Sequence, residues 1–570
     1  MINFIIMLLY CKQKEFSIKL ICIFPPFGKL LQDYRPGGII GFMLLIDRLW
    51  EVHRMRHIKK MLRIIFGRSM FAVVSLAIQI FVLAAAFRFL SFYLAYFYGA
   101  VTLLSAVVII YILNKEENPS FKMSWMIPVT AVPVFGTFFY MLAELHLVER
   151  FMEKKIKARM DETACYLEQN LKVLEQLSKV SRRNANLAHY VKQYGHYPVY
   201  ANTNAQYFPS GEAMFEAMKR EMKEAKRFIF LEFFIIEKGE MWDTILELLE
   251  QKCREGVEVR IMYDGMGSFA FLPRNYVKTL QDMGFKAKVF SPVRPVLSSY
   301  QNNRDHRKIL VVDGHTAFTG GINLADEYIN RKVRFGHWKD AGIMLKGEAV
   351  TSFTMMFLQM WNISEKEPEQ YYNYLKDPEY FYPLELRMDG FVIPYGDSPL
   401  DKEAVGEEIY LDIIHNARQY VHIMTPYLIL DYQMVKSLTF AAKRGVDVSI
   451  ILPHIPDKKY AFLLARSHYG ELIRAGVKIW EYTPGFVHAK VFTSDDTKAA
   501  VGTINVDFRS LYLHFECGTY LYRNEVIGEI ERDYQETLDL CRRITLEDIA
   551  NEPWYERFAG RALRLFSPLM

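Results

Sequence analysis

Three long uncharged runs dominate the hydrophobic pattern in the N-terminal part of this chain. Residues 70–87 and 89–113 are separated by the single charge of Arg88, and a third run covers 123–143. A helix needs about 20 apolar residues to cross the hydrocarbon core of a bilayer. We therefore expect residues 70–145 to form transmembrane helices, which makes the chain an integral membrane protein.

Basic clusters flank this region on both sides, at 54–68 and at 150–159. Positive flanks are typical of the cytoplasmic side, but three full crossings would place the two flanks on opposite sides. Either one run is re-entrant, or the two halves of 70–113 do not both cross. We therefore expect two or three crossings and a cytoplasmic C-terminal part. Residues 1–69 form an N-terminal extension, whose first 54 residues are either extra leader from an over-long gene model or an interfacial anchor.

Beyond the apolar runs the spacing of hydrophobic positions changes twice. Residues 146–200 are charged and amphipathic, which predicts a helical connector near the membrane face. Short apolar strands then alternate with helices in two similar halves, 201–365 and 401–570, joined by a polar linker over 366–400. The predicted fold class is α/β, with two similar α/β sandwich halves behind a helical membrane region. The matching segments are 225–230 with 417–422, 255–261 with 444–450, and 283–289 with 475–481.

Composition narrows the class of protein only slightly. The chain has 570 residues and a net charge of +5, which is too small to indicate a nucleic-acid partner. Its six cysteines are scattered and include no Cys-x-x-Cys pair, so neither a disulfide framework nor a zinc site is expected.

The candidate chemistry lies in a motif that occurs once in each half. The first copy runs from His306 through Lys308 and Asp313 to Asn323, and the second has the same residue types and spacing. Every element of the second copy follows its counterpart by 182 residues. The second copy consists of His488, Lys490, Asp495 and Asn505.

Strand geometry explains the spacing. Positions i and i+2 of a strand face the same way, so His-x-Lys would present an imidazole and an ammonium together. The aspartate would then start a hairpin turn, and the return strand would bring Gly-x-x-Asn back beside the histidine. Asn323 and Asn505 could donate their amides to a phosphate oxygen. Two facing halves would surround one phosphorus with two histidines and two lysines.

This set suits a two-step displacement at a phosphodiester. A neutral imidazole attacks phosphorus and forms a phosphohistidine, while the second imidazole protonates the leaving alcohol and later deprotonates the incoming one. The lysines and asparagines would stabilise charge on the phosphate oxygens. The mechanism requires no metal or other cofactor.

Two carboxylates could orient the histidines. Asp340 and Glu516 precede apolar strands at matching places in the two halves, and we expect them to orient His306 and His488, with Glu516 as the partner of His488. Solvated acids at strand ends are the alternative. Asp313 and Asp495 belong to the catalytic motif, but we expect them to fix the hairpin rather than touch the substrate.

With these motifs, residues 70–570 resemble the phospholipase D superfamily and, within it, the bacterial cardiolipin synthases with two motifs. The resemblance implies an enzyme of the bacterial plasma membrane that condenses two phosphatidylglycerols into cardiolipin and glycerol. Its partners would be phosphatidylglycerol and membrane lipid. One departure is His514, where the family often has Asn. The segments that carry the resemblance are 118–125, 133–136, 303–308, 337–340, 485–490 and 502–516.

Three other activities use the same chemistry. They are a membrane phospholipase D that admits water, a transphosphatidylase for another head group, and a nuclease, which would normally lack three apolar runs. By resemblance we expect His306 to be the nucleophile and His488 the acid and base. The cations of Arg304 and Arg307 would favour a neutral His306 by like-charge repulsion.

Overall fold

The structure is a computed structural model that describes residues 68–89, 94–144, 147–293, 302–367, 369–375, 390–401 and 403–569. The larger compact unit of the chain is Leu76–Met570, and it contains both halves. Nearly all of the predicted extension, 1–69, and much of the predicted linker, 366–400, lie outside the described residues.

Each half contains one mixed sheet. The first has the order β1-β9-β7-β6-β2-β3-β4, in which β2, β3 and β4 are parallel and the remaining pairs are antiparallel. The crossover helices between parallel strands give the strand–helix alternation predicted from the sequence. The strands are β1 (Thr203–Phe208), β2 (Phe228–Phe233), β3 (Glu258–Asp264), β4 (Lys286–Phe290), β6 (Lys308–Val312), β7 (Thr316–Gly320) and β9 (Gly342–Gly347).

The second sheet repeats this order and adds one strand at its edge. It runs β10-β17-β16-β15-β11-β12-β13-β18, so each strand of the first sheet has a counterpart. The predicted repeat of two α/β halves is therefore confirmed. The strands are β10 (Phe391–Asp397), β11 (Tyr420–Met424), β12 (Asp447–Pro453), β13 (Lys478–Tyr482), β15 (Val491–Ser494), β16 (Lys498–Gly502), β17 (His514–Tyr522) and β18 (Cys541–Ile544).

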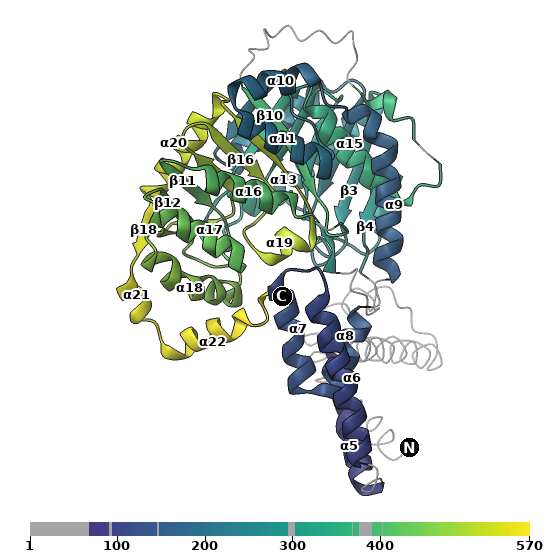
Figure 1. Cartoon of the computed structure of the whole chain (residues 1–570). Helices are drawn as coiled ribbons and strands as arrows, with labels where there is room; N and C mark the ends of the chain where they lie inside the picture. The colour runs from purple at the N-terminus through teal and green to yellow at the C-terminus, as the bar shows by residue number, and fades with distance from the viewer. Residues whose placement is uncertain are drawn as a thin grey trace, which may run out of the picture. The chain divides into compact units, whose positions relative to one another are not determined.

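Helices flank both sheets (Figure 1). The helices of the first half are α12 (Gly211–Glu224), α13 (Glu240–Arg254), α14 (Tyr276–Asp282) and α15 (Val350–Trp361). Its 3₁₀ turns are η3 (Asp326–Ile329), η4 (Asn362–Ser364) and η5 (Tyr371–Tyr374). Those of the second half are α16 (Val405–Asn416), α17 (Tyr432–Lys443), α18 (Lys459–Arg474), α19 (Phe508–Tyr512), α20 (Val526–Leu538), α21 (Leu546–Ala550), α22 (Trp554–Arg564) and η6 (Ser567–Leu569).

Alternate residues of the strands serve two different cores. On β2, Phe228 and Phe230 belong to a core shared by both halves, whereas Ile229 and Leu231 pack with α12 and α13. Both faces of the strand are therefore covered, which explains its continuous hydrophobic run. The shared core also contains side chains of α15, α16 and both sheets, so the halves fold around one interior.

Two short strands cross from one half to the other. β5 (Arg304–Asp305), just before the first motif, pairs in parallel with the start of β17. β14 (Gly485–Val487), just before the second motif, pairs in parallel with β8 (His337–Lys339). One further backbone hydrogen bond extends each of these strand pairings. The His306 amide donates to the Phe515 carbonyl at 2.9 Å, and the His488 amide donates to the Lys339 carbonyl at 2.7 Å.

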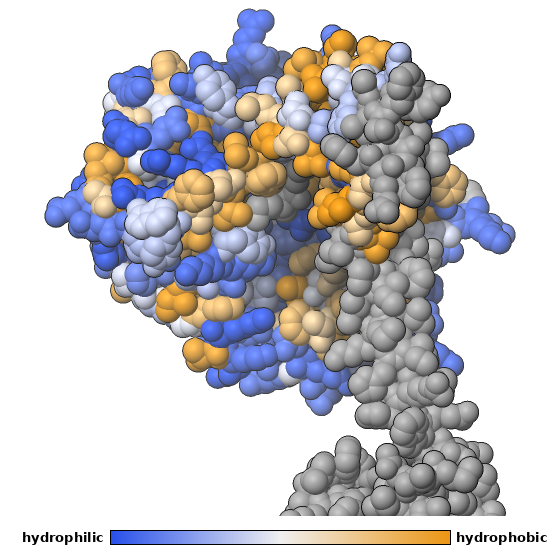
Figure 2. Space-filling view, turned by 90° about the horizontal axis from the view of Figure 1, so that it is seen from below, coloured by the Kyte–Doolittle hydropathy of each residue, from blue (hydrophilic) through white to orange (hydrophobic). Residues whose placement is uncertain are grey.

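The N-terminal region contains α5 (Arg68–Phe89), α6 (Leu94–Asn114), α7 (Pro119–Ala131) and α8 (Pro133–Ala143). Within the described residues, one helical segment, Tyr96–Asn114, is long and apolar enough to cross a membrane. The molecule seen from below has apolar patches between charged residues (Figure 2).

The third uncharged run does not form one continuous helix, and so has the form expected in the alternative with one re-entrant run. The helix stops at Val132, whose φ of −136° and ψ of 74° precede Pro133, because the residue before a proline disfavours helical geometry. The Lys115 ammonium lies 2.7 Å from the Glu144 carboxylate. The two ends of the α7–α8 segment therefore meet, and the segment folds back on itself.

The predicted amphipathic connector is helical. It consists of α9 (Leu147–Thr163), η1 (Ala164–Leu167), α10 (Leu171–Val180) and α11 (Arg182–Tyr194). Val173, Leu177, Ala188 and Val191 of α10 and α11 belong to the shared core. The connector thus packs into the unit formed by the two halves and also links that unit to the apolar helices.

A buried ion pair across the two halves gives a stability prediction. The Lys339 ammonium lies 2.6 Å from the Asp533 carboxylate, which also accepts a 2.7 Å hydrogen bond from Tyr207. Replacing Asp533→Ala leaves a buried ammonium unpaired, so we expect the free energy of unfolding to fall by about 3–5 kcal/mol. Chemical denaturation of the detergent-solubilised full chain measures this loss.

The matched control is Glu175→Ala, which removes an exposed pair with Lys179 on α10 and should leave the denaturation midpoint unchanged. Equal midpoints for the Asp533 and Glu175 variants would contradict a stabilising role for the pair between the halves.

Candidate active site

The two motif aspartates lie at equivalent hairpins and bind backbone amides. Asp313 accepts from the amides of residues 226–228, and Asp495 accepts from those of residues 418–420. Both have a φ of 53°, a left-handed conformation that aspartate tolerates in turns. Their oxygens therefore tie each hairpin to the neighbouring strand, as expected for residues that fix the hairpin.

The two histidines do not lie within regular strands, although the sequence spacing suggested it. His306 follows β5 and precedes β6, and His488 follows β14 and precedes β15. Each histidine therefore lies where the chain leaves the other half and enters its own sheet. This junction brings both imidazoles to the interface between the halves.

Each histidine is hydrogen-bonded to a carboxylate from the opposite half. His306 Nδ1 lies 2.8 Å from Glu516 Oε1, and His488 Nδ1 lies 2.8 Å from Asp340 Oδ2. The expectation that Glu516 would be the partner of His488 is wrong, because the crossing strands exchange the partners. With Nδ1 held by a carboxylate, the Nε2 atom of each ring is the nitrogen left for chemistry.

The carboxylates are themselves held in place. Thr503 donates its hydroxyl to Glu516, and the Trp338 indole donates to Asp340 at 3.3 Å. Both carboxylates are fully buried, so their hydrogen-bond partners are needed to offset the loss of solvation.

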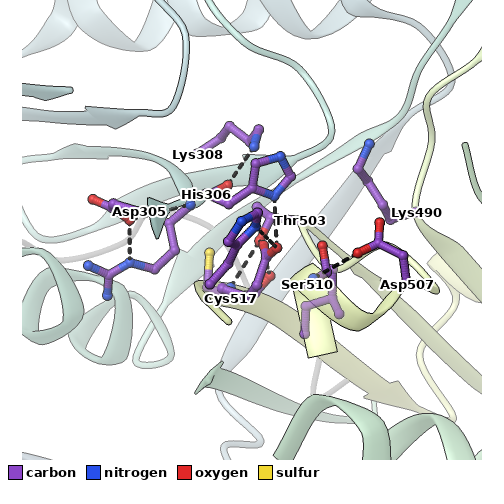
Figure 3. A network of polar contacts seen from close by, with 12 residues as sticks. Asp305, His306, Lys308, Lys490, Thr503, Asp507, Ser510 and Cys517 are labelled. Atoms are coloured by element: carbon purple, nitrogen blue, oxygen red, sulfur yellow. Dashed lines mark hydrogen bonds and ion pairs between the residues drawn. The ribbon is translucent and has the colours of Figure 1, made fainter. Parts of the chain in front are cut away.

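The two lysines occupy equivalent places. The Lys308 ammonium donates to the His306 carbonyl, and the Lys490 ammonium donates to the His488 carbonyl. The two lysine side chains lie on opposite sides of the His306 ring (Figure 3). The motif therefore brings two cations to one histidine, one from each half.

The two asparagines differ. The Asn323 amide group donates to the Tyr328 hydroxyl at 2.7 Å, and its oxygen accepts from the Ile235 amide. The Asn505 side-chain oxygen is buried and has no hydrogen-bond partner. Asn323 is thus engaged by the protein, whereas Asn505 retains hydrogen-bonding capacity in the buried site.

Aromatic rings that were not predicted from the sequence surround the imidazoles. The Phe234 ring lies 4.9 Å from that of His306, while Trp338 and Tyr328 lie 5.3 Å and 5.5 Å from His488. Trp338 is two residues before Asp340 and could have been chosen by that spacing. Phe234 is distant from both motifs in the sequence, and Tyr328, five residues after Asn323, has no spacing that would single it out.

His514 lies against the first histidine. The two rings are 5.5 Å apart, and neither ring nitrogen of the buried His514 has a hydrogen-bond partner. Ligand atoms of His306, His514 and Glu516 lie within 4.8 Å of one another, which is close enough to hold a metal ion. An ion there would use the carboxylate that orients His306, so it would compete with the histidine arrangement described above.

Burial and neighbouring cations set the protonation of the site. Burial, followed by Lys308 and Lys490, places the pKa of His306 well below its usual value. Burial also lowers the pKa of His488 to about 4, although Asp340 opposes that shift. Burial lowers the pKa of Lys308 to about 8 and that of Lys490 to about 7. In the absence of substrate, both imidazoles are neutral near pH 7.

The cations that act on His306 differ from those expected. Arg307 pairs with Glu232 and, at 3.1 Å, with Asp305, so its charge is compensated. Arg304 lies 3.7 Å from Asp264. The lysines of the two motifs, rather than these arginines, favour the neutral imidazole.

Comparisons with known proteins agree with this geometry. The family model described as "Cardiolipin synthase, PLD-like domain" matches residues 218–361 and 410–538. A cardiolipin synthase of Halalkalibacterium halodurans is 32% identical over 84% of this chain and 96% of its own length. One of Geobacillus sp. is 34% identical over 87% of this chain and 99% of its own.

A protein of Streptococcus mutans without an assigned function is 49% identical over 81% of this chain and 99% of its own length. The similarity to the cardiolipin synthases extends over nearly their whole length and includes both halves that build the site. This chain belongs to the cardiolipin synthase family of phospholipase D-like phosphatidyltransferases.

Proposed function

We propose that this protein is a cardiolipin synthase that transfers a phosphatidyl group between two phosphatidylglycerol molecules. His306 Nε2 attacks phosphorus of the first lipid, the phosphorus–oxygen bond to glycerol breaks, and protonated His488 gives its proton to the departing glycerol. His488 then takes a proton from a glycerol hydroxyl of the second lipid. That oxygen displaces His306 from phosphorus, releasing cardiolipin.

The observation that carries this proposal is the exchanged pair of histidine–carboxylate hydrogen bonds. Both Nδ1 atoms are bonded to carboxylates of the opposite half at 2.8 Å, which leaves two Nε2 atoms for the two steps. Lys308, Lys490 and the Asn505 amide are the groups we assign to the phosphate oxygens.

The different charge environments support distinct roles for the histidines. The neighbouring cations Lys308 and Lys490 reinforce the effect of burial on the pKa of His306, and a neutral imidazole is the attacking form. At His488, burial and Lys490 lower the pKa, but the Asp340 carboxylate opposes them and favours the protonated ring. A phosphodiester anion in the site would raise the pKa of His488 further and so supply the acid.

The membrane setting fits two lipid substrates. The family consists of membrane enzymes, and we propose that this one lies in the bacterial plasma membrane with its catalytic unit on the cytoplasmic side. Exchange of one phosphodiester for another needs no nucleotide as an energy source. Water as acceptor would give phosphatidic acid, and another donor or acceptor would give a different lipid.

Reconstitution with phosphatidylglycerol as the only lipid substrate tests the function. We expect cardiolipin and glycerol to form without a nucleotide and in the presence of EDTA, because no step uses a metal. His306→Ala and His488→Ala should each lower the rate at least about 10³-fold, since each removes an essential group. Mass spectrometry of the extracted lipids measures the products.

A matched control is His422→Ala, which removes a buried histidine that pairs with Glu531 rather than with a motif carboxylate. Phosphatidic acid as the main product would overturn the transferase assignment in favour of hydrolysis. An absolute requirement for a nucleotide or a metal would contradict the proposed chemistry.

The lowered lysine pKa values predict a pH effect. Lysine binds phosphate only when protonated, and the pKa values of Lys490 and Lys308 are about 7 and about 8. We therefore expect kcat/KM to fall as the pH rises through this range. In Lys490→Arg the fall should move to higher pH, because arginine stays protonated.

Initial-rate measurements of wild type, Lys490→Arg and Lys308→Arg check this expectation. The same alkaline fall in all three proteins, after allowance for any uniform loss of rate, would show that neither lysine sets it.

A further inference from the structure

The C-terminal helix α22 exposes an apolar stripe on one face. Trp554 is 72% exposed, Phe558 68% and Leu565 48%. They are four and then seven residues apart, which places them on one side of a helix with 3.6 residues per turn. Arg561, also exposed, lies in the same stripe. Large aromatic groups of this kind are costly to leave in water.

The opposite face of α22 is fixed to the catalytic unit. Gly560 is buried, and a side chain there would lie 2.5 Å from the Leu463 carbonyl of α18. Glu556 lies 3.2 Å from the Lys459 ammonium of the same helix. The helix cannot rotate to bury its stripe without losing these contacts, so the stripe is available for a partner.

The end of α22 is attached to the apolar N-terminal helices. The Ser124 hydroxyl of α7 donates to the Leu565 carbonyl at 2.8 Å. Asn118, at the start of α7, binds Asp431 and Tyr512 of the catalytic unit. Ser124 is six residues farther along, which is about 9 Å along a helix. α22 therefore ends beside the apolar helices, past the level at which α7 meets the catalytic unit.

We propose that α22 is a membrane-contact helix whose Trp554–Phe558–Leu565 stripe inserts into the interfacial region of an anionic bilayer. Tryptophan concentrates at the boundary between head groups and hydrocarbon. Exposed Arg557 and Arg561 suit anionic head groups, including the proposed phosphatidylglycerol substrate. Apolar patches on this side of the molecule are visible in Figure 2.

This attachment would complement the spanning helix. Only 17% of the apolar window in Tyr96–Asn114 is buried inside the protein, which suits a lipid-facing helix. A single spanning helix would leave the catalytic halves free to turn about its axis. A second contact through α22 would hold them in one orientation toward the bilayer. The inference rests on the membrane location of the enzyme and is independent of its head-group specificity.

Fluorescence quenching in the reconstituted full chain tests the proposal without turnover. The emission of Trp554 is obtained as the difference between wild type and Trp554→Phe in vesicles of phosphatidylcholine and phosphatidylglycerol. We expect lipids brominated near the head-group end of their acyl chains to quench this component at least as strongly as that of Trp125 on α7. The component of Trp480 on β13, obtained through Trp480→Phe, should not be quenched.

Charge reversal then tests the lipid class. Arg557→Glu with Arg561→Glu should reduce the quenching of Trp554 in vesicles that contain phosphatidylglycerol, whereas Lys172→Glu with Lys179→Glu on α10 should not. An unquenched Trp554 with the emission of a water-exposed indole would overturn the proposal. So would a Trp554 that is protected from the brominated lipids because a second copy of this chain or another protein covers it. Cardiolipin formation with an unquenched Trp554 would overturn this inference and leave the proposed function standing.

Discussion

The exchange of chain between the two halves is the constraint on which the rest of the site depends. β5 pairs with β17, and β14 pairs with β8, immediately before the two histidines. Each histidine therefore receives its backbone partner and its carboxylate from the other half. Neither half can build a complete histidine–carboxylate pair alone, so the site requires both halves to be assembled.

The second constraint is electrostatic. Two histidines, two lysines and two carboxylates are buried within one centre, which is expensive in the absence of compensating interactions. The carboxylates bind the imidazoles, and the lysines donate to main-chain carbonyls, but burial, reinforced by the lysine cations, still holds the imidazole pKa values below the usual range. The proposed phosphodiester substrate would add a negative charge beside the two lysines and so favour the protonated forms of the lysines and of His488.

The sequence predicted the elements that local rules determine. The apolar strand Phe228–Phe233 and the hairpin turn at Asp313 follow from strand and turn geometry. The duplicated sheet order confirms the repeat that the constant motif offset indicated. The exchange of carboxylates between halves could not be predicted, because equal spacing within each copy is compatible with either pairing. The same applies to Phe234 and Tyr328, which reach the histidines only through tertiary packing.

The membrane region shows the same limit. The length of the three uncharged runs made them look alike as candidate membrane helices. The third run is broken at Val132 and Pro133, and the Lys115–Glu144 ion pair brings its two ends together. Hydrophobic length indicates affinity for lipid, but the break before Pro133 prevents this run from forming one continuous helix.

Direct identification of the covalent intermediate tests the central claim. A phosphatidylglycerol labelled in its phosphatidyl group would be mixed with the full-length wild-type enzyme, and the reaction quenched rapidly under alkaline conditions. The account predicts acid-labile label on the peptide that contains His306, and no label in His306→Ala. Label on the His488 peptide of the wild-type enzyme would reverse the roles, and the absence of any phosphohistidine on rapid quenching of wild type would contradict the two-step mechanism.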